Sequence, residues 1–599
     1  MCGIIGYIST DNSIENTEFL RMRDTMIHRG PDGEGAEFFE GNKIAFGHRR
    51  LRIIDLSDAG HQPMCRGNIW ITYNGEIYNF MELKSQLEND YNFSSLSDTE
   101  VIIYGYKKWG IEVLLQKLEG MFAFAIYDQE KDKIFVCRDR VGIKPLFYYK
   151  KNNTLIFSSE LKGIACYSKF NKKISLEGLT SYFRLRYVIG PLSIYENCYK
   201  LLPGSFITYD FETSKVDIQK YWNLSSDLDK NSDKSEKEMV RDIQNALEES
   251  IKHHTLTADV PVHSFLSGGI DSSLVTAMVD RVSDSLSAYS IEVGDTHKNE
   301  IEDAKFVARN LKIPLITDKM DKAKFDELHS EVIMAYDEPL ADTSNVPTYF
   351  LSKLTSKYVK VALSGDGGDE LFYGYKWYGQ FQEGKVSFDN YISKMSNTFN
   401  KELIDELFFG KTTDVSIESI FTATTGNNVF SDKNFHVQDF HSFLVDDILL
   451  KVDNAGMAHS LETRVPFLDR KVVELAFSIS KSQHFKNKEL KYLLKKVGES
   501  YLKNRTLYKE KKGFSVPSIS WLSCNYEHNI INGYATKDKV WDVNVLKRVL
   551  KGKLHQEQKW MLYNFERWYA FQFHNIKEPI VYGFLDKVKR KVNSFVESL

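Results

Sequence analysis

A strand that runs directly into a glycine turn and then a helix constrains the fold of this chain more than any other feature. Residues 260–266 (VPVHSFL) form a buried-strand pattern, Gly268 and Gly269 follow, and a helical pattern starts at Ser272. Further strand patterns cover 287–293, 313–317 and 358–363. Strands that alternate with helices in this way predict a doubly wound parallel sheet with right-handed crossovers.

The glycine turn at 267–273 (SGGIDSS) indicates an anion site. Backbone N–H groups of such a turn, with a helix N-terminus behind them, bind phosphate, and the serines add hydroxyl donors. The alternative is an ordinary turn capped by Ser272, but two glycines flanked by three serines and an aspartate exceed what a cap requires. A Walker loop is excluded, because the only Gly-Lys-Thr in the chain (410–412) lacks the first glycine of that motif.

A second glycine turn, 364–370 (SGDGGDE), follows another strand pattern and carries three carboxylates. Hard oxygen ligands suit Mg²⁺, which commonly bridges carboxylates and phosphates. A solvated acidic loop is the plainer alternative. Two glycine turns at the same end of neighbouring parallel strands favour a ligand site, because ligands bind there in open α/β sheets.

The start of the chain offers a nucleophile. If Met1 is removed, Cys2 carries a thiol and a free α-amine, whose ordinary pKa of about 7.7–8.0 lets it take the thiol proton. The plainer interpretation is that any short residue can follow the initiator. The first 210 residues otherwise show many short strand patterns and few helices, which predicts stacked sheets flanked by helices.

Three further features of the N-terminal part have both a structural and a functional interpretation. Asn74-Gly75 is either the turn of a hairpin or an oxyanion hole built from a side-chain amide and a backbone N–H. Arg50 can pair with a carboxylate through two hydrogen bonds, and Asp98 can hold an ammonium group. The residues by themselves leave both interpretations open.

Composition excludes several classes of protein. The formal net charge of -4 over 599 residues gives no basic field for nucleic acid, and six cysteines without a C-x-x-C pair fit a reducing compartment. The chain has no signal peptide and no run of 18 apolar residues, so we expect a cytoplasmic protein without a membrane span. The polar stretch 224–238 predicts an interdomain linker that runs into a helix.

Many motifs, in the expected order, resemble the glutamine-hydrolysing asparagine synthetase family over most of the chain. Those of the N-terminal part are 2–4 (CGI), 28–32 (HRGPD), 48–51 (HRRL), 74–79 (NGEIYN) and 97–100 (SDTE). Those of the second part are 267–273, 364–370, 446–453 (DDILLKVD), 457–460 (MAHS), 461–469 (LETRVPFLD) and 511–514 (KKGF). The resemblance implies an N-terminal-nucleophile glutaminase domain of four αββα layers (2–212), a linker (213–238), a doubly wound ATP-pyrophosphatase domain (239–525) and a helical C-terminal extension (526–599).

For the first domain the resemblance implies hydrolysis of glutamine. Cys2 would attack the glutamine amide and form a thioester, with its α-amine as the base and with Asn74 and Gly75 as the oxyanion hole. The residues implied to bind glutamine are Arg50 on the carboxylate, Glu76 and Asp98 on the amine, and Leu51, Ile53, Ile54, Asn74 and Gly75 in the rest of the pocket.

For the second domain the resemblance implies that ATP and Mg²⁺ activate a carboxylate as an acyl-adenylate, which ammonia from an internal tunnel converts to the amide. The residues implied to bind ATP are Leu266, Ser267, Gly268, Gly269, Asp271, Ser272, Ser273, Ser364 and Gly365. Asp271 and Asp369 are the candidate Mg²⁺ ligands. Lys511 would stabilise adenylation, and Asp366 takes the place of an acidic residue that acts as base. The family also suggests a homodimer. We expect small-molecule substrates (glutamine, ATP and aspartate or another carboxylate) and neither nucleic acid nor a membrane as a partner.

The acceptor acid is the question that the resemblance leaves open. Aspartate is the leading prediction, and a uronic acid sugar or a peptide carboxylate is the alternative, because fold and motif specify chemistry better than substrate. The chain departs from the usual family pattern at Arg52, Asp366, Tyr373, Asn454 and Gly456. The last three lie where the acceptor is expected to bind, so they put aspartate specificity in question. A non-catalytic protein on this scaffold is a further alternative, against which the intact candidate residues argue.

Overall fold

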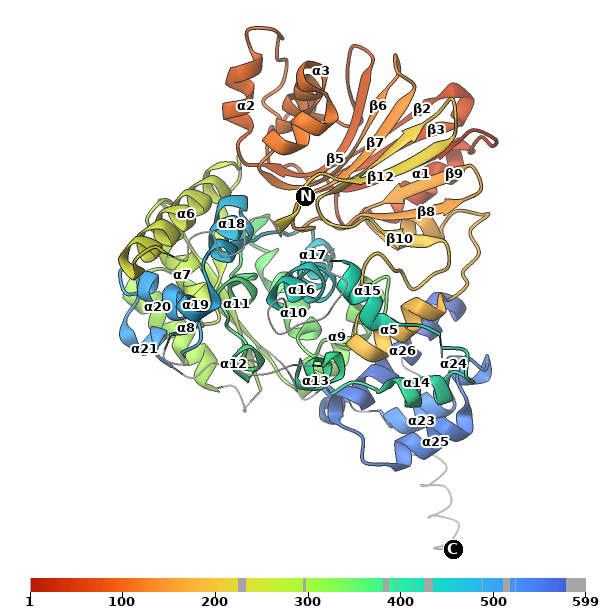
Figure 1. Ribbon diagram of the computed structural model, residues 1–599, viewed down its shortest axis with the longest axis vertical. Coiled ribbons are helices and arrows are strands. Elements are labelled where there is room, and N and C mark those ends of the chain that lie inside the picture. The colour runs from red at the N-terminus through yellow and green to blue at the C-terminus, as the bar shows by residue number, and fades with distance from the viewer. Residues whose placement is uncertain are drawn as a thin grey trace, which may run out of the picture.

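The computed structural model describes residues 2–224, 233–294, 298–380, 387–395, 397–412, 414–424, 435–486, 489–509, 516, 518–522 and 524–577. Lys511 lies outside these ranges. In Figure 1 the N-terminal sheets form the upper part of the molecule, and the last helices, within residues 526–574 and in the darker blue, form the lower right. The N-terminus lies where the upper and lower parts meet, so Cys2 is placed at the boundary between them.

Two antiparallel sheets make up the N-terminal part, with strand orders β10-β8-β9-β1-β3-β2 and β12-β11-β7-β6-β5-β4. The strands of the first sheet are β1 (Gly3–Ser9), β2 (Gly33–Phe39), β3 (Ile44–Arg50), β8 (Phe147–Lys151), β9 (Thr154–Ser158) and β10 (Cys198–Lys200). Those of the second are β4 (Met64–Arg66), β5 (Ile69–Ile77), β6 (Gly120–Asp128), β7 (Lys133–Arg138), β11 (Ser205–Asp210) and β12 (Lys215–Lys220).

The two sheets stack between layers of helices. Because side chains alternate along a strand, Ile4 and Ile8 of β1 pack against the other sheet, whereas Ile5 and Tyr7 pack against helices. The helices on that side are α1 (Asn16–Asp24), α4 (Leu161–Ala165) and α5 (Leu176–Leu185), and those beyond the second sheet are α2 (Phe80–Leu87) and α3 (Asp98–Lys117). The predicted αββα order is therefore confirmed.

Strand β12 lies within the stretch 213–238, which was expected to be a linker. Its residues pair in antiparallel register with β11, from Asp210 opposite Lys215 to Ser205 opposite Lys220. The strand is polar and mostly exposed because it is the edge of its sheet, which is why it has the composition of a linker. Helix α6 (Glu236–Leu256) then begins with a capping box formed by Ser235 and Glu238.

A parallel sheet with the order β15-β14-β13-β16-β17 organises the second part, as predicted. Its strands are β13 (Val262–Phe265), β14 (Ala288–Val293), β15 (Leu315–Met320), β16 (Val361–Leu363) and β17 (Glu462–Arg464). The chain moves outward from β13 through β14 to β15 and then returns to place β16 on the other side of β13. The carboxyl ends of β13 and β16 thus flank the point where the strand order reverses, which is where open α/β sheets bind ligands.

Helices surround this sheet and make up the remainder of the described chain. Around the sheet lie α7 (Ile270–Val279), α8 (Lys298–Leu311), α9 (Lys322–Ala335), α10 (Asn345–Thr355), α11 (Gly368–Leu371) and α12 (Lys376–Gln380). Then follow α13 (Phe388–Met395), α14 (Lys401–Leu407), α15 (Ile417–Ala423), α16 (Phe435–His441), a π-helical turn (Leu444–Leu449) and α17 (Leu450–Met457). The last are α18 (Arg470–Ser478), α19 (Lys481–His484), α20 (Tyr492–Gly498), α21 (Asn504–Leu507), α22 (Ser518–Trp521), α23 (Tyr526–Ile531), α24 (Tyr534–Lys537), α25 (Val543–Lys551) and α26 (Gln556–His574).

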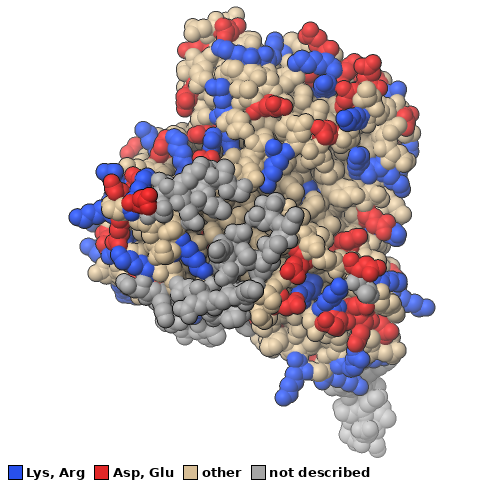
Figure 2. All heavy atoms as spheres, viewed as in Figure 1, with Lys and Arg blue, Asp and Glu red and all other residues tan. Residues whose placement is uncertain are grey.

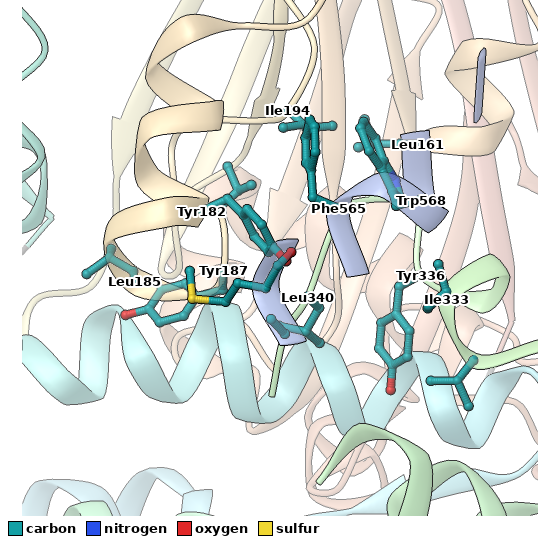
Figure 3. Close-up of a cluster of buried hydrophobic side chains, with 14 of the residues drawn as sticks. Leu161, Tyr182, Leu185, Tyr187, Ile194, Ile333, Tyr336, Leu340, Phe565 and Trp568 are labelled. Atoms are coloured by element: carbon teal, nitrogen blue, oxygen red, sulfur yellow. The ribbon is translucent and has the colours of Figure 1, made fainter. Parts of the chain in front are cut away.

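Helix α26 joins distant parts of the chain in one hydrophobic cluster (Figure 3). Its residues Phe565 and Trp568 lie in the same buried cluster as Tyr182 of α5 and Ile333 of α9. Hydrogen bonds accompany this packing: the Tyr182 hydroxyl donates to the Met561 carbonyl at 2.8 Å. The C-terminal helices are thus part of the main core.

The surface shows no segregation of charge on the face seen in Figure 2, where basic and acidic side chains are interspersed outside the grey atoms. Among the described residues, no helix has both the length and the apolar character needed to cross a membrane.

Candidate active sites

Cys2 is buried immediately before β1, at the junction of the two parts of the chain. Its backbone N–H donates to Asn74 Oδ1 at 2.8 Å, and the Nε of Arg29 donates to its carbonyl at 3.0 Å. Its Sγ lies 4.0 Å from the Leu51 carbonyl oxygen. Main-chain contacts on both sides therefore fix the residue, and removal of Met1 would turn the nitrogen that Asn74 holds into the α-amine.

The thiol of Cys2 is held in its protonated form. Burial raises its pKa, against the opposing effects of the hydrogen bond to Leu51 and the positive charge of Arg50. A thiol in that state needs a base in contact with it before it can act as a nucleophile. The nitrogen of the same residue is within reach of Sγ by covalent geometry alone.

Asn74 and Gly75 lie inside β5, opposite Ala123 and Phe122 of β6. The hairpin interpretation of Asn-Gly is therefore wrong: strand pairing on both sides of the dipeptide overrides its turn preference. The Nδ2 of Asn74 is buried and has no hydrogen-bond partner among the described residues. A buried donor without a partner is costly, and a donor held beside the nucleophile is what an oxyanion hole requires.

Arg50 lies at the end of β3, beside the nucleophile, with its guanidinium turned towards the loop that follows. It donates to the carbonyls of Ser57 at 2.8 Å, Asp55 at 2.5 Å and Ile54 at 3.5 Å. Those carbonyls hold the guanidinium in place. Leu51 and Ile53 pack in an apolar cluster that contains residues of both parts of the chain, with Ile54 at its edge.

Glu76 and Asp98 are the expected partners of the glutamine amine, and both are buried. Glu76 lies in β5, and Asp98 begins α3. Asp98 accepts hydrogen bonds from the Tyr73 hydroxyl at 2.7 Å and the Ile77 N–H at 3.0 Å. Glu76 instead lies 3.2 Å from a guanidinium nitrogen of Arg464, a residue of β17 in the second part. Burial raises the pKa of both carboxyls.

The two glycine turns of the parallel sheet touch each other at its carboxyl edge. Val262 pairs with Val361 and Ser264 with Leu363, so the turns leave adjacent strands at the same level. The approach is so close that a Cβ at Gly365 would lie 2.7 Å from the Ser272 nitrogen. Both turns line one cavity of about 790 Å³, so the two motifs lie together at the carboxyl edge of the sheet.

Most of the residues expected to bind ATP line this cavity. They are Leu266, Ser267, Gly269, Asp271, Ser272, Ser364 and Gly365, together with the expected base Asp366 and the expected metal ligand Asp369. Gly268 and Ser273 are not part of the lining. Gly268 supplies the turn geometry instead, with φ +76 and no room for a side chain beside Ala304.

Asp366 lies two residues after Ser364, whose hydroxyl donates to its carboxylate at 2.7 Å. Burial raises the pKa of Asp366, and the hydrogen bond from Ser364 and the charge of Lys451 oppose that rise. A raised pKa makes this carboxylate a stronger base than an ordinary aspartate.

Lys491 is a residue of this site that the sequence did not single out. It precedes α20, is buried, and bonds with both Asp271 and Asp369; its ammonium lies 2.5 Å from the Asp369 carboxylate. The two carboxylates expected to bind Mg²⁺ are therefore held around one positive charge. Within the described residues no group of three or more such ligands is found, so Mg²⁺ at this position would need phosphate oxygens of a bound nucleotide in addition to the two carboxylates.

Three departures from the family pattern lie outside this cavity. Tyr373 is buried and packs its ring against His484 and Tyr378. Asn454 lines a separate small cavity with Glu338, and Gly456 is required because a Cβ would lie 2.6 Å from the Leu461 carbonyl oxygen. None of the three residues lines the cavity of the two glycine turns, so their positions give no reason to expect an acceptor other than aspartate.

Buried ion pairs join the two parts of the chain, and one of them involves Arg29, which also contacts Cys2. The Nη1 of Arg29 lies 2.9 Å from the Glu160 carboxylate on its own side and 2.8 Å from that of Asp453 on α17. Lys200 similarly lies 2.9 Å from Glu338 and 3.2 Å from Asp446. Arg29 thus has a carboxylate partner in each part of the chain, and Lys200 of the first part has both of its partners in the second. Removal of either cation would leave buried carboxylates with fewer partners.

Comparison with known proteins agrees with this geometry. Residues 1–222 match the sequence model of the glutamine amidotransferase domain, and residues 242–570 match that of asparagine synthase. Asparagine synthetase [glutamine-hydrolyzing] 1 of Bacillus subtilis is 32% identical over 566 residues, which cover 87% of this chain and 88% of that protein. The chain belongs to the glutamine-hydrolysing asparagine synthetase family.

Two more relatives share this similarity. A putative asparagine synthetase [glutamine-hydrolyzing] 2 of Methanocaldococcus jannaschii is 38% identical over 396 residues, 63% of this chain and 76% of that protein. Asparagine synthetase [glutamine-hydrolyzing] 3 of Bacillus subtilis is 30% identical over 549 residues, 86% of this chain and 87% of that protein. The synthetase is therefore an ATP-using enzyme of glutamine-dependent amidation.

Proposed function

We propose that this synthetase converts L-aspartate to L-asparagine with ATP and with ammonia released from glutamine. The observation that carries the proposal is the pairing of two sites: a buried Cys2 with an unpartnered amide donor beside it, and a cavity lined by both glycine turns. The family's named activity supports aspartate as the acceptor.

At the first site Cys2 attacks the carbonyl carbon of the glutamine amide, and its α-amine takes the thiol proton. Asn74 Nδ2 and the Gly75 N–H stabilise the oxyanion. Collapse of the tetrahedral intermediate returns the proton to the leaving nitrogen and releases ammonia, which leaves a thioester. Water then releases glutamate. We assign Arg50 to the glutamine carboxylate and Glu76 and Asp98 to its amine, and Leu51, Ile53 and Ile54 to the pocket wall.

At the second site a carboxylate oxygen of aspartate attacks the α-phosphorus of ATP, and pyrophosphate leaves. Backbone and hydroxyl groups of the first turn bind the phosphates, because the free N–H groups of a helix N-terminus point at them. Mg²⁺ held by Asp271 and Asp369 would neutralise phosphate charge when bound. Lys511, which lies outside the described residues, is proposed to stabilise the same step.

Ammonia then attacks the acyl carbon of the adenylate, AMP leaves, and Asp366 accepts the proton that the nitrogen loses. Neutral ammonia is required, so it must travel without meeting water. The cluster between the two parts supports such a route because it is apolar: it contains Leu51, Met121 and Ile143 from one side and Leu274 and Leu363 from the other.

The division of the chain follows from the same proposal. We place the glutaminase domain at 2–212 and extend its sheet by β12. We place the synthetase domain from 239 to 525 and the C-terminal extension at 526–599; the described helices of that extension, α23 to α26, pack onto the synthetase domain. A homodimer remains a prediction from the family.

Cys2→Ala tests the two-site mechanism. The variant should lose all glutamine-dependent asparagine synthesis and keep synthesis from added ammonia, since the synthetase cavity is untouched. Loss of both activities in a folded protein would refute the division of labour.

The acceptor is tested separately by pyrophosphate release over a panel of carboxylic acids that includes aspartate, a uronic acid and a peptide. No release with aspartate, together with no rescue of an asparagine auxotroph, would refute the proposed acceptor.

A further inference from the structure

The synthetase cavity contains a cation that comes from the glutaminase half of the chain. Arg186 follows α5 directly and lines the cavity together with both glycine turns. Its position in the sequence, inside the match to the amidotransferase domain, gives no reason to expect it there. The glutaminase half therefore contributes a side chain to the other active site.

The backbone of Arg186 is fixed from both sides. The residue has a left-handed conformation with φ 71, and its N–H donates to the Tyr182 carbonyl at 2.7 Å, which ends helix α5. Its own carbonyl accepts a hydrogen bond at 2.9 Å from the N–H of Ala341, a residue that precedes Asp342 in the cavity wall. A non-glycine residue in this conformation needs such support.

The side chain of Arg186 is held as well, but its hydrogen-bonding capacity is not used up. Nε donates to the Asp447 carboxylate at 2.9 Å, and the guanidinium lies 5.4 Å from the centre of the Phe443 ring. The side chain is 18% exposed, and within the described residues its Nη1 and Nη2 donate to no acceptor. Those two nitrogens can bind a ligand through four N–H groups without disturbing the contacts that orient them.

The other cations of the cavity are already engaged by carboxylates of the protein. Lys451 lies 2.7 Å from Asp342, Lys495 lies 2.6 Å from Glu489, Lys509 lies 2.8 Å from Asp303, and Lys491 bonds with Asp271 and Asp369. Lys376 is an exposed side chain. Arg186 is therefore the half-buried guanidinium of this cavity, and two of its nitrogens donate to no acceptor in the described chain.

We propose that Arg186 binds the carboxylate of the acceptor that is not activated, which is the α-carboxylate of aspartate. The inference rests on the proposed function. A planar guanidinium binds a carboxylate through two parallel hydrogen bonds, which a lysine ammonium cannot reproduce. With the α-carboxylate held by Arg186, the side-chain carboxylate alone is free to meet ATP, so the arginine also determines which carboxylate is adenylated.

Arg186→Lys and Arg186→Met test the proposal by pyrophosphate release at saturating ATP. We expect the KM for aspartate to rise about 10- to 100-fold, the range for losing a charged hydrogen-bond pair, with a smaller change in the KM for ATP. Arg184→Lys is the matched control, because Arg184 lies in α5 two residues before Arg186 but donates to Phe399 and Asp389 outside the cavity. Circular dichroism and the glutaminase rate report folding of each variant.

A second substrate separates recognition of the α-carboxylate from general damage. The α-amide of aspartate keeps the side-chain carboxylate and lacks the one assigned to Arg186. In the wild type, the KM for the α-amide should exceed the KM for aspartate by about the same factor as the substitutions raise the KM for aspartate. In Arg186→Met, the two KM values should be about equal. Equal KM values for aspartate in wild type and Arg186→Lys, or unchanged discrimination in Arg186→Met, would overturn the proposal. If the wild type released no pyrophosphate with aspartate, the proposed function would be refuted, and the assignment of Arg186 to the α-carboxylate of aspartate would be refuted with it.

Discussion

Arg29 connects the nucleophile to the partner domain, so its replacement should reveal how strongly the two domains depend on each other. Its side chain has no exposed surface and lies between Glu160 and Asp453, while its Nε holds the Cys2 carbonyl. Arg29→Met keeps most of the side chain's apolar length and removes the charge. Both carboxylates then stay buried with fewer partners.

The size of the effect follows from the partners that remain. Glu160 keeps Lys162 at 2.7 Å and His28 at 3.0 Å, so it loses little. Asp453 keeps only Lys144, at 3.8 Å, among its ion-pair partners in the described chain. Breaking a buried pair costs about 3–5 kcal/mol when one charge is left uncompensated. Because Lys144 still partly compensates Asp453, we expect the lower end of that range, about 3 kcal/mol. For a domain of this size that corresponds to a fall of about 6–12 °C in the melting temperature.

Calorimetry or thermal fluorescence measures that fall, and glutaminase activity measured alongside should decrease because Cys2 loses its Arg29 contact. The double variant Arg29→Met/Asp453→Asn removes the orphaned charge and should recover about 1–2 kcal/mol. Arg23→Met is the control, because the carboxylates that Arg23 contacts are 40% and 55% exposed and such pairs contribute under about 1 kcal/mol. A melting temperature of Arg29→Met equal to that of the control would refute the reasoning.

Two further predictions concern the second part of the chain. Gly365→Ala should lower pyrophosphate release about tenfold or more with the glutaminase rate unchanged, because its Cβ would lie 2.7 Å from the Ser272 nitrogen and force the two turns apart; a wild-type rate would contradict the contact between them. Burial raises the pKa of Glu566 to about 8 from its ordinary 4.5, against hydrogen bonds from Tyr534 and Ala535. Between pH 4.5 and pH 8 the folded state therefore keeps a proton that the unfolded state has lost. The free energy of unfolding falls as the pH rises through the folded-state pKa, and this group should lower it by about 1.4 kcal/mol from pH 7 to pH 9. Glu566→Gln should lack that part of the fall in denaturant unfolding, and an identical pH dependence would show that the carboxyl is ionised throughout.

Local signals account for what the sequence predicted well. Strand and helix periodicity in the second part, with glycines at the strand ends, was enough to predict the parallel sheet and the meeting of the turns after β13 and β16. Alternating apolar residues in the N-terminal part likewise predicted stacked sheets. These features depend on residues within a few positions of one another.

The remaining features depend on contacts between residues far apart in the chain. Asn74-Gly75 has the composition of a turn, and only its pairing with β6 makes it strand. Lys491 reaches Asp271 across 220 positions, and Arg186 reaches Asp447 across 261. A lone lysine or arginine carries no local pattern that marks such a role, so the charged side chains that complete the synthetase site could be found only in the folded chain.

The packing of helix α26 has a consequence for the order in which this protein is made. The cluster that contains Tyr182 of the glutaminase half also contains Phe565 and Trp568, and the Trp568 indole donates to the Asp337 carbonyl at 2.9 Å. A chain still emerging from the ribosome lacks these residues until synthesis is nearly complete. We therefore expect the helical layer over the first sheet to keep an apolar face exposed until late in synthesis, and exposed apolar surface of this kind favours aggregation of incomplete chains.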